Sequence, residues 1–171
     1  MNCVSILTSS ILSLTLPSCE RINTAPAQKG AAADEAIGRS RGGLSTKINA
    51  AVDAAGNLLR IIVRPGQSHE SKEAAALIEG LEINKVLADR GYDGDAFRNV
   101  IAAAGGEAVI PSIPARKTPI DYDKVVYKER NVVERFFCKI KHYRRIATRY
   151  DKTVISYVAM FHLAGAMIWL R

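Results

Sequence analysis

The sequence predicts an α/β protein in which a mixed β-sheet carries helices on its faces. Its 171 residues, 48% of them hydrophobic, are enough for one domain with a buried core and do not have a disordered composition. Strand-like and helix-like segments follow one another in the order β-β-α-β-α-β-α-α. Strands that alternate with helices in this way are typical of a layered α/β architecture.

The first two strands are expected to form a β-hairpin. Residues 44–52 alternate in part between apolar and polar side chains, and residues 58–63 are mostly apolar. Between them, Asp53-Ala54-Ala55-Gly56-Asn57 has the composition of a turn. Pro65 and Gly66 then end the second strand.

Helices and strands alternate after the hairpin. We expect helices at residues 70–79 (with Ser68 as the N-cap), 95–104 and 124–143, strands at 83–88 and 108–110, and a last helix from Thr153. The last helix covers an apolar run whose length is at the lower limit for a membrane span. Because Ser156 and His162 interrupt this run, a buried helix that closes the core is the favoured interpretation.

Positive charge is concentrated in one part of the chain. The net charge is +7, and the segment from Arg116 to Arg149 contains 11 Lys and Arg against four Asp and Glu, a surplus that equals the charge of the whole chain. A basic segment of this kind indicates a polyanionic partner, most simply DNA or RNA. A solvated surface without a partner is the alternative.

The three cysteines indicate neither a set of structural disulfides nor a metal site. Their number is odd and no Cys-x-x-Cys pair occurs, so neither a disulfide scaffold nor a zinc site is indicated. Cys138 follows two phenylalanines and is expected to be a small core residue.

Four polar residues in the long helix are spaced so as to share one stripe. Tyr127, Arg130, Glu134 and Lys141 have offsets of 0, 3, 7 and 14, which at ~100° per residue fall within about 60° of one another. A carboxylate among cations is what a metal ligand beside a phosphate requires. The alternative is a surface glutamate that makes i,i+4 salt bridges, although its neighbours Val133 and Phe136 place Glu134 beside the apolar side of the helix.

Asp89 is the second candidate carboxylate. It ends a predicted strand, where α/β folds place functional side chains, and a Gly-rich turn follows it. Asp89 and Glu134 together would suit Mg²⁺, which prefers carboxylate, water and phosphate oxygens. Two such ions ~4 Å apart would activate an attacking hydroxyl and stabilise the leaving oxygen in phosphodiester displacement. The alternative is a structural role, because Asp is common in turns.

Cations near these carboxylates are candidates for binding DNA. Arg130 and Lys141 would contact phosphate, and Tyr127 would bond to or stack on DNA. The further basic candidates along the same segment are Arg116, Lys117, Lys124, Arg135, Lys139, Arg144 and Arg145.

Three segments resemble the DDE transposases of bacterial insertion sequences, in the insertion-sequence-5 branch of the insertion-sequence-4-like superfamily. The hairpin region of that family is similar to GRSRGGLSTKINAAVDAAGNLLRIIVRPGQSHE. The segment with the second catalytic Asp is similar to VLADRGYDGDAFR, and the segment with the catalytic Glu to YKERNVVERFFCKIKHYRRIATRYDK. The resemblance covers residues 29–171 and carries the family's functional positions onto Asp89 and Glu134, with Tyr127, Arg130 and Lys141 beside them.

The resemblance implies a ribonuclease-H-like mixed sheet with flanking helices and metal-dependent cleavage and strand transfer of DNA. It implies Mg²⁺ or Mn²⁺ held by Asp89 and Glu134, and as partners the terminal inverted repeats of the element and the target DNA. It allows a homo-oligomer assembled on DNA. We expect a cytoplasmic bacterial protein that associates with the nucleoid when it is on DNA, and no membrane partner.

One departure from the family concerns its first catalytic Asp, which should lie on a strand before the hairpin. Residues 1–33 contain no Asp, and neither Asp34 nor Asp53 is placed to replace it. We therefore expect the first strand to be missing or non-native and the chain to be inactive alone. The alternative function is that of a non-catalytic DNA-binding remnant, which would inhibit an intact transposase.

Residues 1–28 are interpreted as an out-of-frame or disordered segment, and residues 29–171 as a partial catalytic domain. With free codon choice, another reading frame across residues 15–30 permits the missing motif Asp-Ser-Thr-x-x-Arg-Ala-His. An exported lipoprotein is the alternative, because the segment before Cys19 is apolar. However, no Lys or Arg precedes Arg21, so the basic start of a signal peptide is absent.

Overall fold

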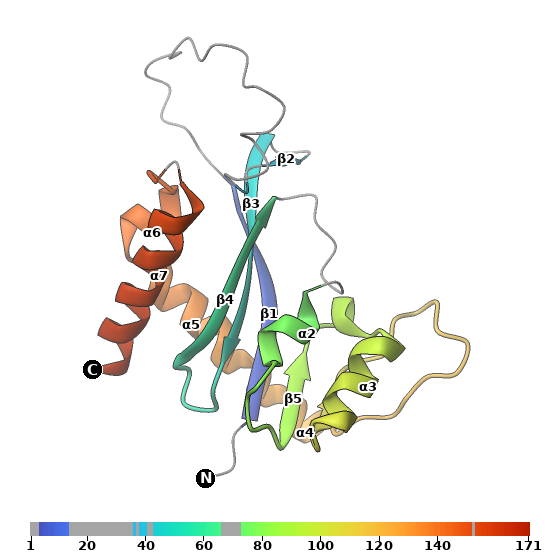
Figure 1. The fold of residues 1–171 in the computed structure, drawn as a ribbon. Helices are drawn as coiled ribbons and strands as arrows, with labels where there is room; N and C mark the ends of the chain where they lie inside the picture. The colour runs from blue at the N-terminus through green and yellow to red at the C-terminus, as the bar shows by residue number, and fades with distance from the viewer. Residues whose placement is uncertain (1–3, 14–35, 37, 41–42, 66–72, 152) are drawn as a thin grey trace.

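The computed structural model describes residues 4–13, 36, 38–40, 43–65, 73–151 and 153–171, which form a six-stranded sheet with helices on both faces (Figure 1). The strands are β1 (Val4–Ser13), β2 (Gly38–Ser40), β3 (Gly43–Val52), β4 (Leu58–Pro65), β5 (Lys85–Ala88) and β6 (Glu107–Val109). The helices are α2 (Ala74–Ile78), α3 (Asp95–Ala103), α4 (Lys124–Tyr127), α5 (Asn131–Lys141), α6 (Arg144–Thr148) and α7 (Val154–Trp169), with 3₁₀ turns η2 (Arg90–Tyr92) and η3 (Lys128–Arg130).

Strand β1 lies in the centre of the sheet. It pairs antiparallel with β3 and parallel with β5, where Leu7 is the partner of Ala88. Since β4 pairs with β3 and β6 with β5, the sheet has the order β4-β3-β1-β5-β6. This is the ribonuclease-H-like order expected when one strand precedes the hairpin.

The first strand was expected to be missing or non-native, and the presence of β1 excludes the first of these alternatives. The ten residues of β1 are rich in β-branched and other apolar side chains, and their backbone satisfies the hydrogen-bonding edges that β3 and β5 would otherwise leave open. A non-native origin of this strand and a domain boundary at residue 28 stay predictions, as residues 14–35 lie outside the described part of the chain.

The hairpin was predicted correctly. Strands β3 and β4 pair antiparallel, and the turn between them is closed by Asp53, whose Oδ1 accepts hydrogen bonds from the backbone N–H groups of Ala55 (2.9 Å) and Asn57 (2.8 Å). Gly56 supplies the positive φ of 88° that this turn needs.

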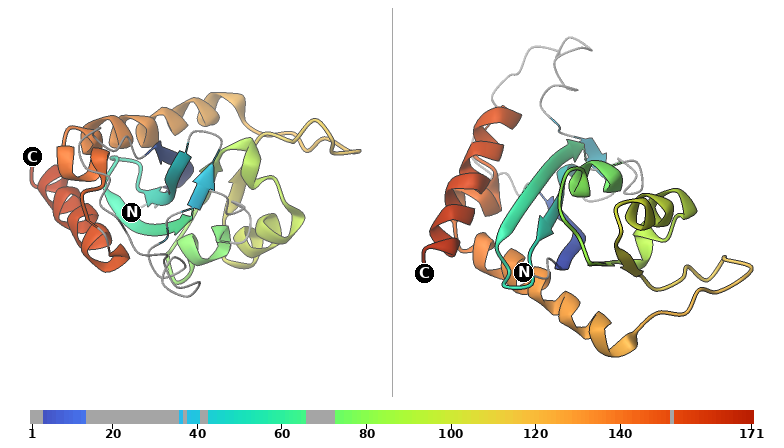
Figure 2. Two further views of the ribbon diagram at one scale, coloured as in Figure 1. Left: turned by 90° about the horizontal axis from the view of Figure 1, so that it is seen from above. Right: turned by 60° about the horizontal axis from the view of Figure 1, so that its bottom comes forward.

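Two hydrophobic cores lie on opposite faces of the sheet, because successive residues of a strand point to opposite sides. In β3, Ile48 and Ala50 belong to the core under α5 and α7, whereas Ala51 belongs to the core under α2 and α3. In β5, Leu87 faces the first core and Val86 the second. Figure 2 shows α5 and α7 on the other side of the strands from α2 and α3.

The long predicted helix is divided into α4, η3 and α5. The backbone stays right-handed helical through the junction, with φ and ψ of −57° and −26° at Tyr127 and −52° and −24° at Arg130, so the 3₁₀ turn tightens the helix without ending it. Asp123 caps the start of α4 by accepting from the N–H groups of Val125 and Val126. Helix α2 is shorter than predicted, and Ser68 lies outside the described residues.

Helix α7, the last helix, packs against the core with one face and leaves the opposite face exposed. Tyr157, Phe161 and Ala164 of α7 are buried, but Ile155 and Leu163 are exposed, so the prediction of a buried helix holds for one side. None of the helices in the described part of the chain has the length and apolarity needed to cross a membrane. Cys138 is exposed, and the prediction of a core cysteine is wrong because the buried stripe of α5 passes through Phe136, Phe137 and Ile140 instead.

An ion-pair cluster around Asp93 fastens the loop after β6 to the start of α3. The Asp93 side chain is fully buried (0% exposed) and its two oxygens accept from Arg98 Nε (2.8 Å), Arg116 Nε (2.9 Å) and the Ile113 N–H (2.8 Å). Arg116 also donates from Nη1 to Asp95 (2.7 Å). We call this group the Asp93 clasp. Arg116, which the sequence predicted to bind DNA, is therefore bonded to acidic side chains of the same chain.

The clasp lowers the pKa of Asp93. Burial acts to raise that pKa, but the hydrogen bonds from Arg116, the Ile113 N–H and Arg98 outweigh it and hold the pKa below its ordinary value of 3.8. A carboxyl group with a lowered folded-state pKa stabilises the fold fully above its unfolded-state pKa. This stabilisation is lost as the pH falls through the folded-state value.

We predict that Asp93→Asn destabilises the fold at pH 7 by about 3 kcal/mol, because it removes the buried charge that Arg98, Arg116 and the Ile113 N–H hold in place. The difference from the parent chain should be constant above about pH 5 and shrink as the pH falls from 3.8 through the lower folded-state pKa, where folded Asp93 also takes up a proton. Urea unfolding of both chains across this range measures it.

The matched control is Asp121→Asn, an exposed carboxylate in the same loop, which should change the free energy of unfolding by less than about 0.5 kcal/mol. An equal loss in both variants, or a difference that does not depend on pH, would contradict this role of the clasp.

Candidate active site

Asp89 directly follows β5 on the side of the sheet that α5 covers. Leu87 packs in the core under α5, whereas Val86 and Ala88 pack in the core under α2 and α3. The alternation along an extended strand therefore turns Asp89 to the α5 side. The 3₁₀ turn η2 begins at the next residue and ends the strand at this point.

One arginine joins the two predicted carboxylates. Arg130 Nη1 lies 2.5 Å from Asp89 Oδ1, and Arg130 Nη2 lies 2.5 Å from Glu134 Oε1. Residues that are 41 positions apart in the chain, Asp89 and Arg130, thus meet at one guanidinium. The side chains of Asp89, Arg130 and Glu134 are 32%, 22% and 54% exposed, so the cluster is open to a substrate from solvent.

The rotation of α5 about its axis places Glu134 in this cluster. The buried residues of α5 recur at i, i+3, i+4 and i+7, at Val133, Phe136, Phe137 and Ile140. This apolar stripe packs on the sheet, and Glu134 lies beside it at the edge that faces Asp89. Arg130 is one turn earlier, at the i,i+4 distance suited to an ion pair.

Tyr127 lies next to Arg130 in the same arrangement. The guanidinium carbon of Arg130 is 5.8 Å from the centre of the Tyr127 ring, a cation–π distance. The Tyr122 ring packs edge-on against Tyr127, with centroids 5.3 Å apart. Burial is the largest cause that raises the pKa of Tyr127 above 10.0, so its hydroxyl stays a hydrogen-bond donor at neutral pH.

The donor set is suited to a single divalent ion rather than to two. Mg²⁺ is commonly held by one or two carboxylates together with water and phosphate oxygens, which Asp89 and Glu134 satisfy. Over the described residues, no three His, Cys, Asp or Glu side chains form a group able to hold a metal ion. Asp53 is used in the hairpin turn, and Asp34 lies outside the described residues.

The register of the sheet gives the residue of β1 that lies next to Asp89. Leu7 of β1 pairs with Ala88 of β5, so the next residues along these parallel strands are Thr8 and Asp89. Strand β1 contains no acidic residue. The position beside Asp89 in the central strand is therefore filled by a threonine.

The predicted DNA-binding cations divide into exposed side chains and side chains held by acids. Lys141, Arg135, Lys139, Arg144 and Lys117 are exposed. Arg116 is held in the Asp93 clasp, and Arg145 makes two hydrogen bonds to Asp151 (2.8 and 3.0 Å). Lys141 is seven residues beyond Glu134, ~10 Å along the helix axis, where it does not touch the carboxylates but can reach the next phosphates of a bound strand.

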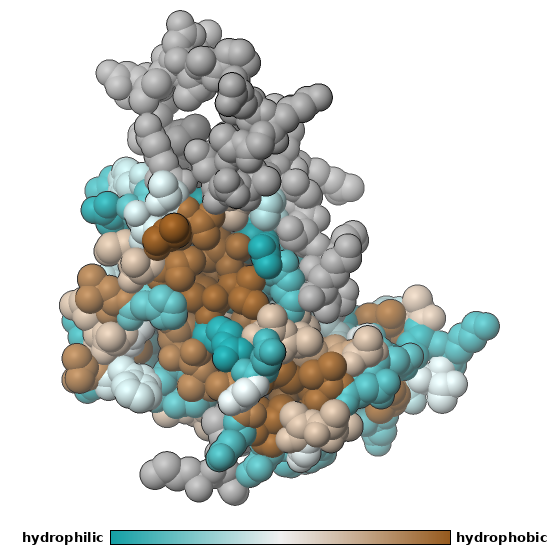
Figure 3. Space-filling model, viewed as in Figure 1, coloured by the Kyte–Doolittle hydropathy of each residue, from teal (hydrophilic) through white to brown (hydrophobic). Residues whose placement is uncertain are grey.

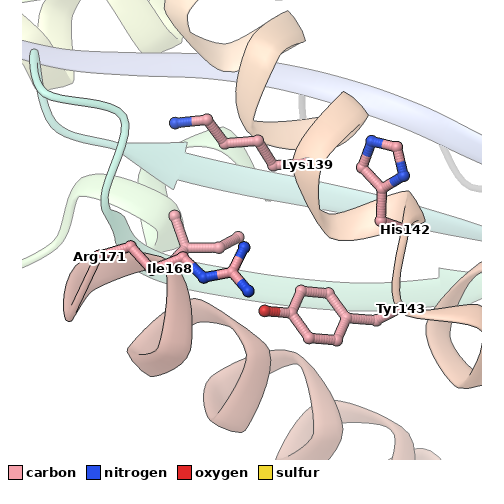
Figure 4. A pocket seen from close by; sticks show the side chains of 5 residues that line it. All are labelled: Lys139, His142, Tyr143, Ile168 and Arg171. Carbon is pink, nitrogen blue, oxygen red and sulfur yellow. The ribbon is translucent and has the colours of Figure 1, made fainter.

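Lys139 lines a cavity of about 440 Å³ between the end of α5 and the end of α7. Its other lining residues are His142, Tyr143, Ile168 and Arg171. In Figure 4 the Tyr143 hydroxyl and the Arg171 guanidinium point toward one another across this cavity. The lining contains no acidic side chain, so the cavity extends the positive surface that begins at Lys141.

Sequence reasoning missed two buried polar groups. The first is the Asp93 clasp, which the pattern of Asp93, Asp95 and Arg98 around a helix start signals only weakly. The second is Arg149, which is buried at a φ of 47°, lies 4.9 Å over the Tyr157 ring and donates to the Ala36 carbonyl and to Thr46 Oγ1. No spacing in the sequence distinguishes this arginine from its exposed neighbours.

Comparisons with known proteins identify the family of this chain. Residues 20–169 match the family described as Transposase DDE domain. The inferred transposase for insertion sequence element IS6501 of Brucella ovis is 43% identical over 130 residues, which cover 75% of this chain and 100% of that protein.

Two solved structures are also similar. The Mos1 transposase paired-end complex with left transposon end has a TM-score of 0.41 at 12% identity, over 87% of this chain. The Mos1 mariner paired-end complex with Mn has a TM-score of 0.42 at 12% identity, over 88% of this chain. This chain spans about half the length of those chains, 55% and 56%, and at such scores they support no detail of the site.

The matched family covers most of the chain, and it uses divalent metal ions and acts on DNA. The chain therefore belongs to the DDE-domain transposases, the proteins that carry out DNA transposition.

Proposed function

We propose that this chain is a transposase catalytic domain that binds DNA but does not cut it alone. The observation that carries this proposal is the charge of the cluster: two carboxylates share one guanidinium, and the adjoining central strand has no acid. With two ligands instead of three, a divalent ion would be held weakly and without a fixed geometry.

The named residues would divide the work as follows. Asp89 and Glu134 would hold Mg²⁺ or Mn²⁺, which supplies activation of the attacking oxygen and stabilisation of the leaving oxygen. Arg130 keeps the two carboxylates at one place and offsets part of their charge. Tyr127 would donate its hydroxyl to a phosphate or stack on a base, and Lys141 would contact the neighbouring phosphate.

The DNA partners would be the terminal inverted repeats of the element and the target DNA. Exposed cations along α5 and after it supply the sequence-independent part of this binding. Bound copies would assemble as a homo-oligomer on DNA, in the bacterial cytoplasm. Because it binds DNA without cutting it, this chain would occupy the DNA sites of an intact transposase and inhibit that enzyme. This is the alternative function, that of a non-catalytic DNA-binding remnant.

We predict that the chain nicks supercoiled plasmid no faster than its Asp89→Asn variant, in Mg²⁺ or in Mn²⁺. Thr8→Asp should supply the missing ligand beside Asp89, since Thr8 follows the Leu7–Ala88 pair in register. Calorimetric titration with Mn²⁺ should then show affinity raised about tenfold, because affinity depends on the charge of the ligand set.

Thr8→Asn is the control for size and polarity, and adding Asp89→Asn to Thr8→Asp should abolish the gain. Nicking by the parent chain that Asp89→Asn removes would overturn the proposed inactivity. An unchanged Mn²⁺ affinity in Thr8→Asp would show that the site of the third ligand lies elsewhere.

We predict that DNA binding weakens steeply with salt. About four phosphate contacts, from Arg135, Lys139, Lys141 and Arg144, give a slope of log K against log salt near ~−3.6. Lys141→Gln should make that slope shallower by about 1, as measured by fluorescence anisotropy with a labelled duplex.

Lys85→Gln is the matched control, because Lys85 pairs with Glu107 at 3.1 Å on the sheet and should not change the slope. Binding that does not depend on salt would refute an electrostatic DNA face. An equal effect of both substitutions would place that face elsewhere.

A further inference from the structure

Helix α7 is apolar on all sides, yet the fold covers only one of them. From Val154 to Trp169 it contains no Asp, Glu, Lys or Arg. Its buried residues are Tyr157, Phe161, Ala164 and Gly165, and a Cβ added to Gly165 would lie 3.0 Å from the Leu58 side chain. A helix that is apolar all round normally has a neighbour on each side.

The uncovered side of α7 carries much of the exposed apolar surface of the molecule. Half of the ten exposed large hydrophobic residues in the described part of the chain lie on this helix or at its cap: Ile155 (83%), Leu163 (56%), Met167 (45%), Trp169 (63%) and Leu170 (87%). At ~100° per residue they occupy one arc of about 160°. Both views in Figure 2 place α7 at the outer edge of the molecule.

Apolar surface extends from α7 toward β4. Figure 3 shows brown, hydrophobic atoms gathered on the side of the molecule where these two elements lie. An open hollow of about 200 Å³ is lined there by Leu58, His162, Gly165, Ala166 and Trp169. Side chains of a docked helix could enter this hollow.

Two pairs of exposed residues on this face lie symmetrically about its centre. Ile155 and Leu170 lie equally far from the midpoint between His162 and Leu163, and so do Ala159 and Ala166. When two identical helices pack antiparallel about a two-fold axis, residues equally far from the axis face each other. Large residues would then meet at the ends, and the two alanines would allow close approach between them.

We propose that α7 forms a two-fold, antiparallel interface with α7 of a second copy of this chain. The five exposed side chains offer roughly 600 Å² per copy, or ~1,200 Å² in total, which reaches the lower end of the range for specific interfaces. The face carries no Lys or Arg that would favour nucleic acid, and a second copy would pair Ile155 with Leu170 and Ala159 with Ala166 while burying an area sufficient for a dimer. This association does not require DNA, so it can fail while the proposed function holds.

The first test is sedimentation of the full chain without DNA. The parent should form a dimer, and Leu163→Arg should raise its dissociation constant at least tenfold, because two like charges would meet near the axis. Val125→Arg, at a residue that is 74% exposed on α4, is the matched control and should leave the dimer unchanged. A parent chain that stays monomeric would overturn the proposal, as would equal loss in both variants.

The second test is cross-linking, which remains decisive if Leu163→Arg does not fold. In a background with Cys3, Cys19 and Cys138 replaced by serine, a mixture of Ala159→Cys and Ala166→Cys chains should form disulfide dimers. Each variant alone should cross-link at least fivefold less. Dimers of Ala159→Cys alone would indicate a parallel pairing and contradict the proposal, and so would binding to lipid vesicles without dimer formation.

Discussion

The architecture depends on the pairing of β1 with both of its neighbours. This strand is the only connection in the described sheet between the antiparallel hairpin of β3 and β4 and the parallel pair of β5 and β6. Its alignment with β5 determines how far Asp89 extends beyond the sheet. The same alignment also supports the surface on which α5 packs, so the position of Glu134 follows from it as well.

The candidate site places two negative charges and one positive charge close together. Two carboxylates at one place repel each other, and Arg130 reduces that repulsion from within the chain. Because the guanidinium comes from the same helix as Glu134, the cluster forms as soon as α5 packs on the sheet. Any divalent ion would therefore enter a site that already has a cation at its centre, and its binding free energy would depend on how far Arg130 moves toward a bound phosphate.

Sequence alone predicted those parts of the structure that periodicity controls. The hairpin, the strand that ends at Asp89 and the helix with Arg130 and Glu134 all follow from alternation or from the 3.6-residue repeat. The engagement of Arg116 by Asp93 could not be predicted, because it joins side chains 23 residues apart through a loop. The exposed face of α7 was also missed, since an apolar sequence does not distinguish a buried side from one left for a partner. The central strand was not assigned from the sequence, because residues 4–13 lack the acid by which the family's first strand would be identified.

The Asp93 clasp also anchors the loop after β6 from within. Arg116 and the Ile113 N–H are held by Asp93, and Ser112 Oγ accepts from the Ile120 N–H at 2.9 Å and so closes the neck of the loop. Beyond that neck the chain extends away from the sheet (Figure 1). Because Ile113 and Arg116 lie within the stretch that this neck closes, a change in the length of the loop would move the arginine that holds Asp93 and, with it, the start of α3.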